Sequence, residues 1–158
     1  MPSSKFWLVS GSILAGLAVA LGAFAAHGLD KVLNSVYSET DIRTIAGLSV
    51  PAAWKYLQDF KTAAEYQLTH SLALLVVGLL ARDGTSRSLA IAGWSFLGGI
   101  ALFSGSLYVL AVTGLRVLGA ITPLGGVLFL IGWVSLALAA VRLPFPSATA
   151  AEERRSPV

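Results

Sequence analysis

The residues of this chain best suited to chemistry are its two histidines, because each lies at the end of an apolar segment. His27 follows the apolar stretch 6–26, and His70 lies near the start of the stretch 66–81. If both stretches cross a membrane, the hairpin between them brings the two imidazoles to the same face of the bilayer. Imidazoles on adjacent helices can ligate a haem, or a metal ion together with a carboxylate such as Glu65.

Other polar side chains are expected at the same membrane depth, in the outer half of the bundle, when depth is counted at 1.5 Å per residue. A quinone headgroup would use a histidine together with a tyrosine or serine donor from this group. Alternatively, the side chains only stabilise the bundle by hydrogen bonds between helices, and Arg116 extends to the lipid headgroups. The predicted polar layer consists of His27, Glu65, Tyr66, Gln67, His70, Ser104, Ser106, Tyr108, Arg116 and Thr122.

The composition indicates a membrane protein. Of the 158 residues, 56% are hydrophobic and 12% are charged, and the mean hydropathy is +0.77. Soluble domains carry about 25% charged residues. The net charge of +3 comes from scattered basic residues, so no nucleic-acid surface is expected. The absence of cysteine excludes disulfides, thiolate metal sites and iron–sulfur clusters.

The fold class predicted is an all-α integral membrane bundle of four transmembrane helices with one long extracytoplasmic loop. Spans are expected at about 6–26, 66–81, 89–113 and 117–141, since a span needs roughly 20 apolar residues. The loop 28–62 is expected to be partly helical from Pro51, a residue suited to the first position of a helix. Residues 1–143 form the membrane domain, and 144–158 are predicted to be a disordered tail.

The distribution of lysine and arginine favours a topology with both termini in the cytoplasm, because short cytoplasmic loops carry an excess of these residues. The long loop between the first two spans also carries basic residues, but it is balanced by acidic ones. The basic residues assigned to the cytoplasmic side are Lys5, Arg82, Arg87, Arg142, Arg154 and Arg155.

Small residues at four-residue spacing are expected to let the helices pack closely, either within one bundle or between copies of the chain. One such stripe in the first span is Ser12, Gly16 and Ala20. Pro123 is expected to kink the fourth helix, because proline lacks the backbone donor. The packing positions predicted are Ala18, Gly22, Ala26, Gly105, Gly125 and Gly126.

Four sequence segments resemble the signatures of the DUF423 family of small membrane proteins. They are LGAFAAHGL at 21–29, EYQLTHSLAL at 65–74, LFSGSLY at 102–108 and TPLGG at 122–126. The resemblance covers about 6–141 in the expected order, and it implies a four-helix bacterial inner-membrane protein without an activity to carry over. Compared with the family pattern, the segment 30–51 looks like an insertion.

The sequence therefore predicts a non-enzymatic membrane protein, either an accessory or assembly subunit of a membrane complex or a small homo-oligomer. The alternative is binding of a quinone, lipid, haem or metal in the polar layer, although no cofactor is predicted outright. The expected partners are the lipid bilayer and either another membrane protein or a second copy of the chain. Hydrolysis is not expected because no G-x-S-x-G elbow is present. Transport is not expected either, because the sequence shows no inverted repeat of the kind found in transporters.

Overall fold

The computed structural model describes residues 1–82 and 84–142, most of which are helical. Four helical segments are long and apolar enough to cross a membrane, so the all-α membrane fold is confirmed. The tail 144–158 lies outside the described residues. The first two spans are α1 (Ser4–His27) and α3 (Ala52–Leu80). The third span combines α4 (Arg87–Gly99), the π-helical η1 (Ile100–Ser104) and α5 (Gly105–Thr113). The fourth span combines the 3₁₀ helix η2 (Arg116–Ala120) and α6 (Thr122–Val141).

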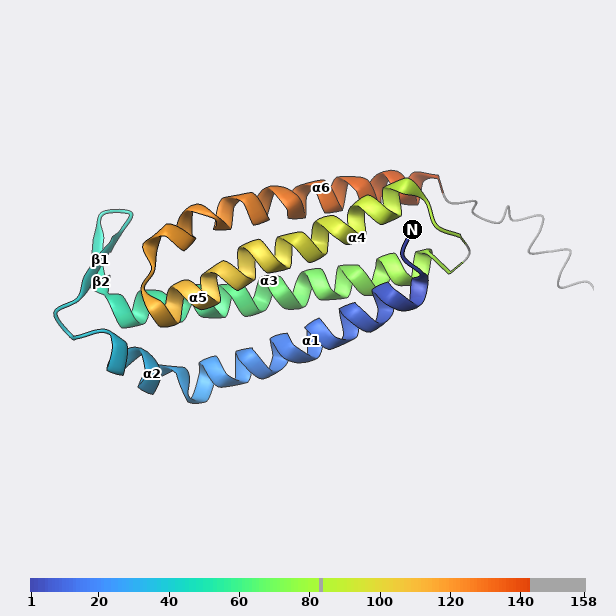
Figure 1. Ribbon diagram of the computed structural model, residues 1–158. Helices are drawn as coiled ribbons and strands as arrows, with labels where there is room; N and C mark the ends of the chain where they lie inside the picture. Colours follow the sequence, from blue (N-terminus) through green and yellow to red (C-terminus); the bar gives the residue numbers. More distant parts are fainter. Residues whose placement is uncertain (83, 143–158) are drawn as a thin grey trace, which may run out of the picture.

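The four spans form an open row rather than a closed bundle (Figure 1). α1 packs on α3, α3 packs on the α4–α5 segment, and α4 packs on α6, so that α1 and α6 lie at opposite sides. Within the described residues, α3 and α6 make almost no close backbone contact. The two helices therefore meet through side chains, and the candidate site lies between them.

The face that α1 presents to α3 carries a small residue at every seventh position, namely Ser4, Gly11, Ala18 and Ala25. A Cβ atom on Gly11 would lie 2.9 Å from the carbonyl oxygen of Ser71, and the hydroxyl of Ser4 donates to the carbonyl of Gly78 (2.7 Å). A seven-residue repeat stays on one side of a helix, whereas a four-residue repeat drifts around it. This drift is why Ala18 is buried but Ala26 of the predicted stripe is exposed.

Pro123 does not kink the fourth helix, contrary to the sequence prediction. It lies in the first turn of α6, which begins at Thr122. The missing N–H of a proline is harmless there, because the first N–H groups of a helix have no partner within the helix. The proline therefore marks the start of the membrane helix, after the short 3₁₀ turn of η2.

The segment between α1 and α3 folds as a small cap on one end of the row, the hairpin end. It contains α2 (Leu29–Val36) and an antiparallel hairpin of β1 (Ile42–Ile45) and β2 (Leu48–Pro51). The tight turn between the strands uses positive φ angles at Ala46 (49°) and Gly47 (84°). The loop is thus more ordered than predicted, and the long helix begins at Ala52 rather than Pro51, whose backbone is extended.

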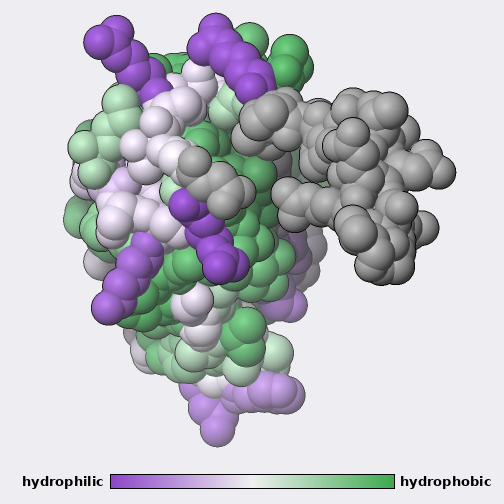
Figure 2. Space-filling view, turned by 90° about the vertical axis from the view of Figure 1, so that its right-hand side faces the viewer, coloured by the Kyte–Doolittle hydropathy of each residue, from purple (hydrophilic) through white to green (hydrophobic). Residues whose placement is uncertain are grey.

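The opposite, N-terminal end of the row holds the chain start, the α3–α4 connection and the end of α6 (Figure 1). Figure 2 views this end, where hydrophilic side chains project around apolar helices. Four exposed basic residues belong to it: Lys5, Arg82, Arg87 and Arg142.

Candidate functional site

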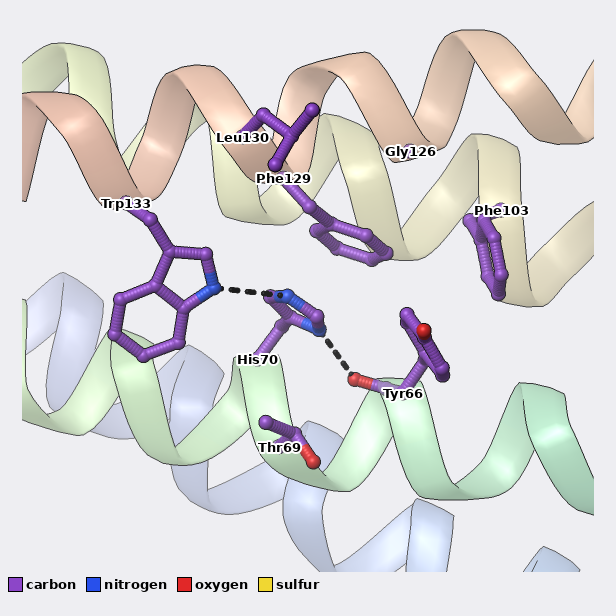
Figure 3. Close-up of a pocket in the computed structure, with 8 residues that line it drawn as sticks. All are labelled: Tyr66, Thr69, His70, Phe103, Gly126, Phe129, Leu130 and Trp133. Carbon is purple, nitrogen blue, oxygen red and sulfur yellow. Dashed lines mark hydrogen bonds between the residues drawn. The ribbon is translucent and has the colours of Figure 1, made fainter.

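An aromatic groove lies between α3, η1 and α6, where the row of helices is open (Figure 3). Its cavity measures about 500 Å³. Its rim includes Tyr66 and Trp133, which are 43% and 44% exposed, so the groove opens on the lateral surface of the row. The lining residues are Tyr66, Thr69, His70, Phe103, Gly126, Phe129, Leu130 and Trp133.

His70 lies at the base of the groove and is only 5% exposed. The indole Nε1–H of Trp133 donates to its Nε2 (3.2 Å), and its Nδ1 lies 2.7 Å from the carbonyl oxygen of Tyr66 (Figure 3). An indole can only donate, so Nε2 carries no proton and Nδ1–H donates to the carbonyl. The imidazole is therefore neutral, and both of its nitrogens are engaged.

Stacked rings hold this imidazole in place. The ring of Phe129 lies 3.4 Å from the ring of His70, at an interplanar angle of 11°. Tyr66 stacks between His70 (5.8 Å) and Phe103 (4.6 Å). Aromatic pairs at separations such as those of Tyr66 contribute about 0.5–1.5 kcal/mol per pair beyond their buried area. The wall of the groove is therefore a preformed aromatic surface with one polar ring in it.

Glycines on the facing helices make room for these rings. A Cβ atom on Gly99 would lie 2.4 Å from the Phe129 ring, and a Cβ atom on Gly125 would lie 2.4 Å from the backbone nitrogen of Phe103. Phe103 itself belongs to the π-helical turn η1, a kind of turn that often occurs at functional sites. The glycines and the π turn together allow α6 to approach η1 closely, while the groove remains between α6 and α3.

The structure distributes the predicted polar layer over several places. Of its members, only Tyr66 and His70 line the groove. Gln67 points to α1, where its side-chain amide donates to the carbonyl of Leu14 (2.9 Å). The hydroxyls of Ser106 and Thr122 are 2.8 Å apart and join α5 to α6.

The remaining members of the layer lie apart from the groove or have no partner. The hydroxyls of Ser104 and Tyr108 are buried without a hydrogen-bond partner among the described residues. Glu65 and Arg116 are exposed. The set therefore does not form one continuous polar network.

The two histidines are not neighbours, which corrects the expectation that the hairpin between the first two spans brings both imidazoles to one face of the bilayer. His27 is exposed at the end of α1, where the nearby Phe24 ring contacts Phe60. On α3, His70 lies one turn beyond Gln67, whose side chain contacts Leu14 of α1. On α1, Leu14 is about 20 Å from His27 along the helix axis. A haem or metal held by both histidines is incompatible with this separation. Within 1–82 and 84–142, no group of three His, Asp or Glu side chains could hold a metal ion.

The expected depth of His70 was counted from Tyr66, whereas α3 begins 14 residues earlier, at Ala52. The helix starts at Ala52 and has 29 residues, about 43 Å, which exceeds a hydrocarbon core of about 30 Å. Counted from the helix end at Leu80, His70 is about 15 Å in, near the middle of such a core.

Sequence reasoning missed the aromatic members of the site. Phe129 and Trp133 are four residues apart and share one face of α6. Phe103 lies seven residues after Phe96, which also contacts Trp133 (5.2 Å). Aromatic pairs at helical spacing on two consecutive spans were the available signal, but the prediction considered only polar and charged side chains.

The row of spans with its lateral groove defines a small, multi-pass α-helical membrane protein. A family model described as "Protein of unknown function (DUF423)" matches residues 21–126, and the chain belongs to this family. The resemblance found in the sequence is thus confirmed. No solved structure matches the chain significantly.

Several relatives of the chain are named as membrane proteins. The chain is 44% identical over 140 residues to the UPF0382 membrane protein YwdK of Bacillus subtilis, covering 87% of this chain and 98% of that protein. It is 42% identical over 138 residues to a UPF0382 membrane protein of Staphylococcus epidermidis, covering 87% and 97%. A UPF0382 membrane protein of Haemophilus influenzae is 44% identical over 125 residues, covering 78% and 84%.

Proposed function

We propose that this membrane protein is non-enzymatic and binds an isoprenoid quinone in the groove between α3 and α6. The observation that carries the proposal is the lipid-open, aromatic cavity of about 500 Å³ with the half-exposed Tyr66 at its rim. Ligand pockets typically measure about 300–1,000 Å³ and combine apolar walls with a few polar groups. A quinone ring matches the aromatic wall, and its isoprenoid tail would leave through the open side into the lipid.

The groove supplies donors for a quinone carbonyl. The Tyr66 ring is stacked and half exposed, and no described residue is a hydrogen-bond partner of its hydroxyl. Thr69 also lines the cavity, although its hydroxyl donates to the carbonyl of Glu65 (2.9 Å). His70 is already saturated, so its role is to orient Trp133 and the backbone of Tyr66. Tyr66 is therefore the direct donor in this proposal.

The binding test uses purified protein in lipid nanodiscs and decylubiquinone as the probe. Trp133 lines the groove, so bound quinone should quench its fluorescence in a saturable way, and Trp133→Phe should remove most of that quenching. Gly126→Leu should block binding, because a Cβ atom at Gly126 meets only a Phe103 atom at 4.0 Å and the added side chain can enter the groove. Gly16→Leu, on the open face of α1, is the matched control.

Unsaturable quenching, or equal binding by Gly126→Leu and the unchanged protein, would refute the proposal. The protein extracted from its own membrane gives a second readout. Quinone retained in that sample supports the assignment, whereas a retained phospholipid in the same groove shows that the ligand is an acyl chain.

We further propose that the protein works in association, as an accessory or assembly subunit of a membrane complex or as a homo-oligomer. The supporting observation is α1, whose most apolar window is only 17% buried, against 50% for α3. Ser12, Gly16 and Ala20 are exposed on it, and nothing lies within 4 Å of a Cβ atom built on Gly16. Small residues at this spacing let another helix approach closely.

Native mass spectrometry of gently extracted protein tests the association. A mass that exceeds one chain, and that falls to a single chain in Gly16→Leu but not in Gly126→Leu, supports it. A bare monomer in both variants and in the unchanged protein argues against it.

We also propose a cytoplasmic location for the N-terminal end, within the bacterial cell membrane. The exposed basic residues gathered at that end support this orientation, because cytoplasmic loops are enriched in lysine and arginine.

A further inference from the structure

Three basic side chains from three different elements surround one hollow at the hairpin end. Arg43 comes from β1, Lys55 from the first turn of α3, and Arg116 from η2. The hollow measures about 280 Å³, and Tyr56, Leu110 and Gly119 complete its lining. We refer to it as the basic hollow.

A fixed aromatic base positions two of these cations. Tyr56 is 3% exposed and stacks on Tyr37 with 4.7 Å between the ring centres. The Nε–H of Arg43 donates to the Tyr56 hydroxyl (3.3 Å), and the guanidinium lies 5.6 Å from the ring centre. The ammonium of Lys55 lies 5.4 Å from the same ring centre.

The hollow keeps a surplus of positive charge and of unused donors. Lys55 is paired with Asp59, but among the described residues no carboxylate forms an ion pair with Arg43 or Arg116. The nearby Asp41 accepts hydrogen bonds from Ser38 instead. A guanidinium has five N–H donors in a planar fork, which matches the oxygens of a phosphate group.

The position of the basic hollow along the membrane normal is set by α6. This helix has 20 residues, about 30 Å, which equals the thickness of a hydrocarbon core. If α6 spans this core, Thr122 lies at the membrane edge and Arg116 lies just outside it, at the level of the headgroups. Beside Arg116, Leu115 and Val117 are 54% and 70% exposed, as expected where a surface touches lipid.

We propose that the basic hollow binds the headgroup phosphate of an anionic phospholipid. The phosphodiester would lie between the guanidinium groups of Arg43 and Arg116, and the acyl chains would run along the exposed apolar side chains of α5 and α6, including Val109 and Leu124. This site is separate from the aromatic groove and does not depend on quinone binding there.

The test is native mass spectrometry of the full chain in detergent, with phosphatidylglycerol or phosphatidylcholine of identical acyl chains added at equal concentration. We expect preferential binding of phosphatidylglycerol. Arg43→Gln and Arg116→Gln should each lower its occupancy about fivefold, since one basic residue contributes roughly that factor to binding an anionic lipid surface. Lys31→Gln removes an exposed charge from α2 at the same end and should leave the occupancy unchanged. Circular dichroism melting verifies that each variant is folded.

Three results would overturn the proposal. The first is equal binding of the two lipids by the unchanged protein, and the second is equal loss in Lys31→Gln and the two arginine variants. The third concerns the source of the phosphate. If inorganic phosphate at millimolar concentration displaces phosphatidylglycerol and stays bound through the same arginines, the hollow holds a free anion and not a lipid.

Discussion

At the residue scale, the hydrogen bond between Trp133 and His70 joins α3 to α6, which otherwise meet through stacked rings, with few backbone contacts. Trp133→Phe keeps a ring but leaves Nε2 of the buried imidazole without a donor. We expect a loss of about 1–2 kcal/mol in unfolding free energy, within the range for an unpaired buried acceptor and for hydrogen bonds between membrane helices.

Thermal unfolding in detergent, followed by circular dichroism, measures this loss. Trp94→Phe is the control, because Trp94 is 55% exposed and its indole N–H has no partner among the described residues. Equal melting temperatures for the two variants would mean that the bond to His70 contributes nothing to stability.

Single glycines provide a second residue-scale prediction. Gly125→Ala places a methyl group 2.4 Å from the backbone nitrogen of Phe103, which cannot move aside as a flexible side chain could. We expect destabilisation of about 1–3 kcal/mol, the usual cost of overpacking. Gly16→Ala faces open space in the single chain, so in monomeric protein it should change stability by at most about 0.5 kcal/mol, as surface substitutions do. If both variants melt alike, α6 and η1 do not pack as closely as the structure shows.

The sequence was informative about polar residues and uninformative about how they are grouped. His70 and Tyr66 could be singled out because polar groups within a span are costly and need a reason. Their grouping with His27 failed because depth was counted from Tyr66. The sequence predicted helix from Pro51 onward, but the apolar run begins only near Tyr66, so the depth was counted from there although α3 begins at Ala52.

At the element scale, the cap depends on one side chain that reaches back to a membrane helix. The hydroxyl of Tyr37, directly after α2, donates to the carbonyl of Ala111 in α5 (2.9 Å). Burial, together with the neighbouring Tyr56, raises the pKa of Tyr37 to about 12 from its ordinary value of 10.0. The hydroxyl thus remains a donor at neutral pH.

Tyr37→Phe should loosen the cap. We expect amide hydrogen exchange in 29–51 to become about fivefold faster, the effect of losing a bond of about 1 kcal/mol, while α4 and α6 are unchanged. Hydrogen exchange with mass spectrometry measures it. Unchanged rates in 29–51 would show that the aromatic stack on Tyr56 alone anchors the cap.

The pH dependence of the same contact has a definite sign. The pKa in the folded state lies above the unfolded value, so the stabilisation is fully present below pH 10 and is lost as the pH rises toward 12. In the unchanged protein, exchange in 29–51 should therefore gain an extra acceleration over this range, beyond the intrinsic effect of pH on exchange. That extra acceleration should be absent in Tyr37→Phe, and its persistence would assign it to another group.

Helix pairing also shows what the sequence pattern could and could not predict. The four spans followed from apolar length alone, and all four are present. The α1 face that packs on α3 repeats every seven residues in Ser4, Gly11, Ala18 and Ala25, whereas the prediction followed four-residue stripes. Which spans become neighbours was not visible, because the spans are apolar on every side and lipid and protein favour the same residues.

At the scale of the whole molecule, the open row explains the aromatic groove and the exposed face of α1. A closed bundle would pack α3 against α6 and fill the aromatic groove with apolar side chains. In the row, each outer helix has a free side: α6 exposes the groove, and α1 exposes its small residues.

The orientation of the row in the membrane can be tested without preparatory changes, because the chain contains no cysteine. Ser35 is exposed on α2 at the hairpin end, and Thr85 is exposed in the α3–α4 connection at the N-terminal end. We expect a membrane-impermeant maleimide to label Ser35→Cys in intact cells and Thr85→Cys only after the cells are opened. Labelling of both after opening shows that both thiols are accessible. The reverse pattern in intact cells would place the basic N-terminal end outside the cell and the basic hollow at the cytoplasmic leaflet. The lipid proposal would then be tested with lipids of that leaflet.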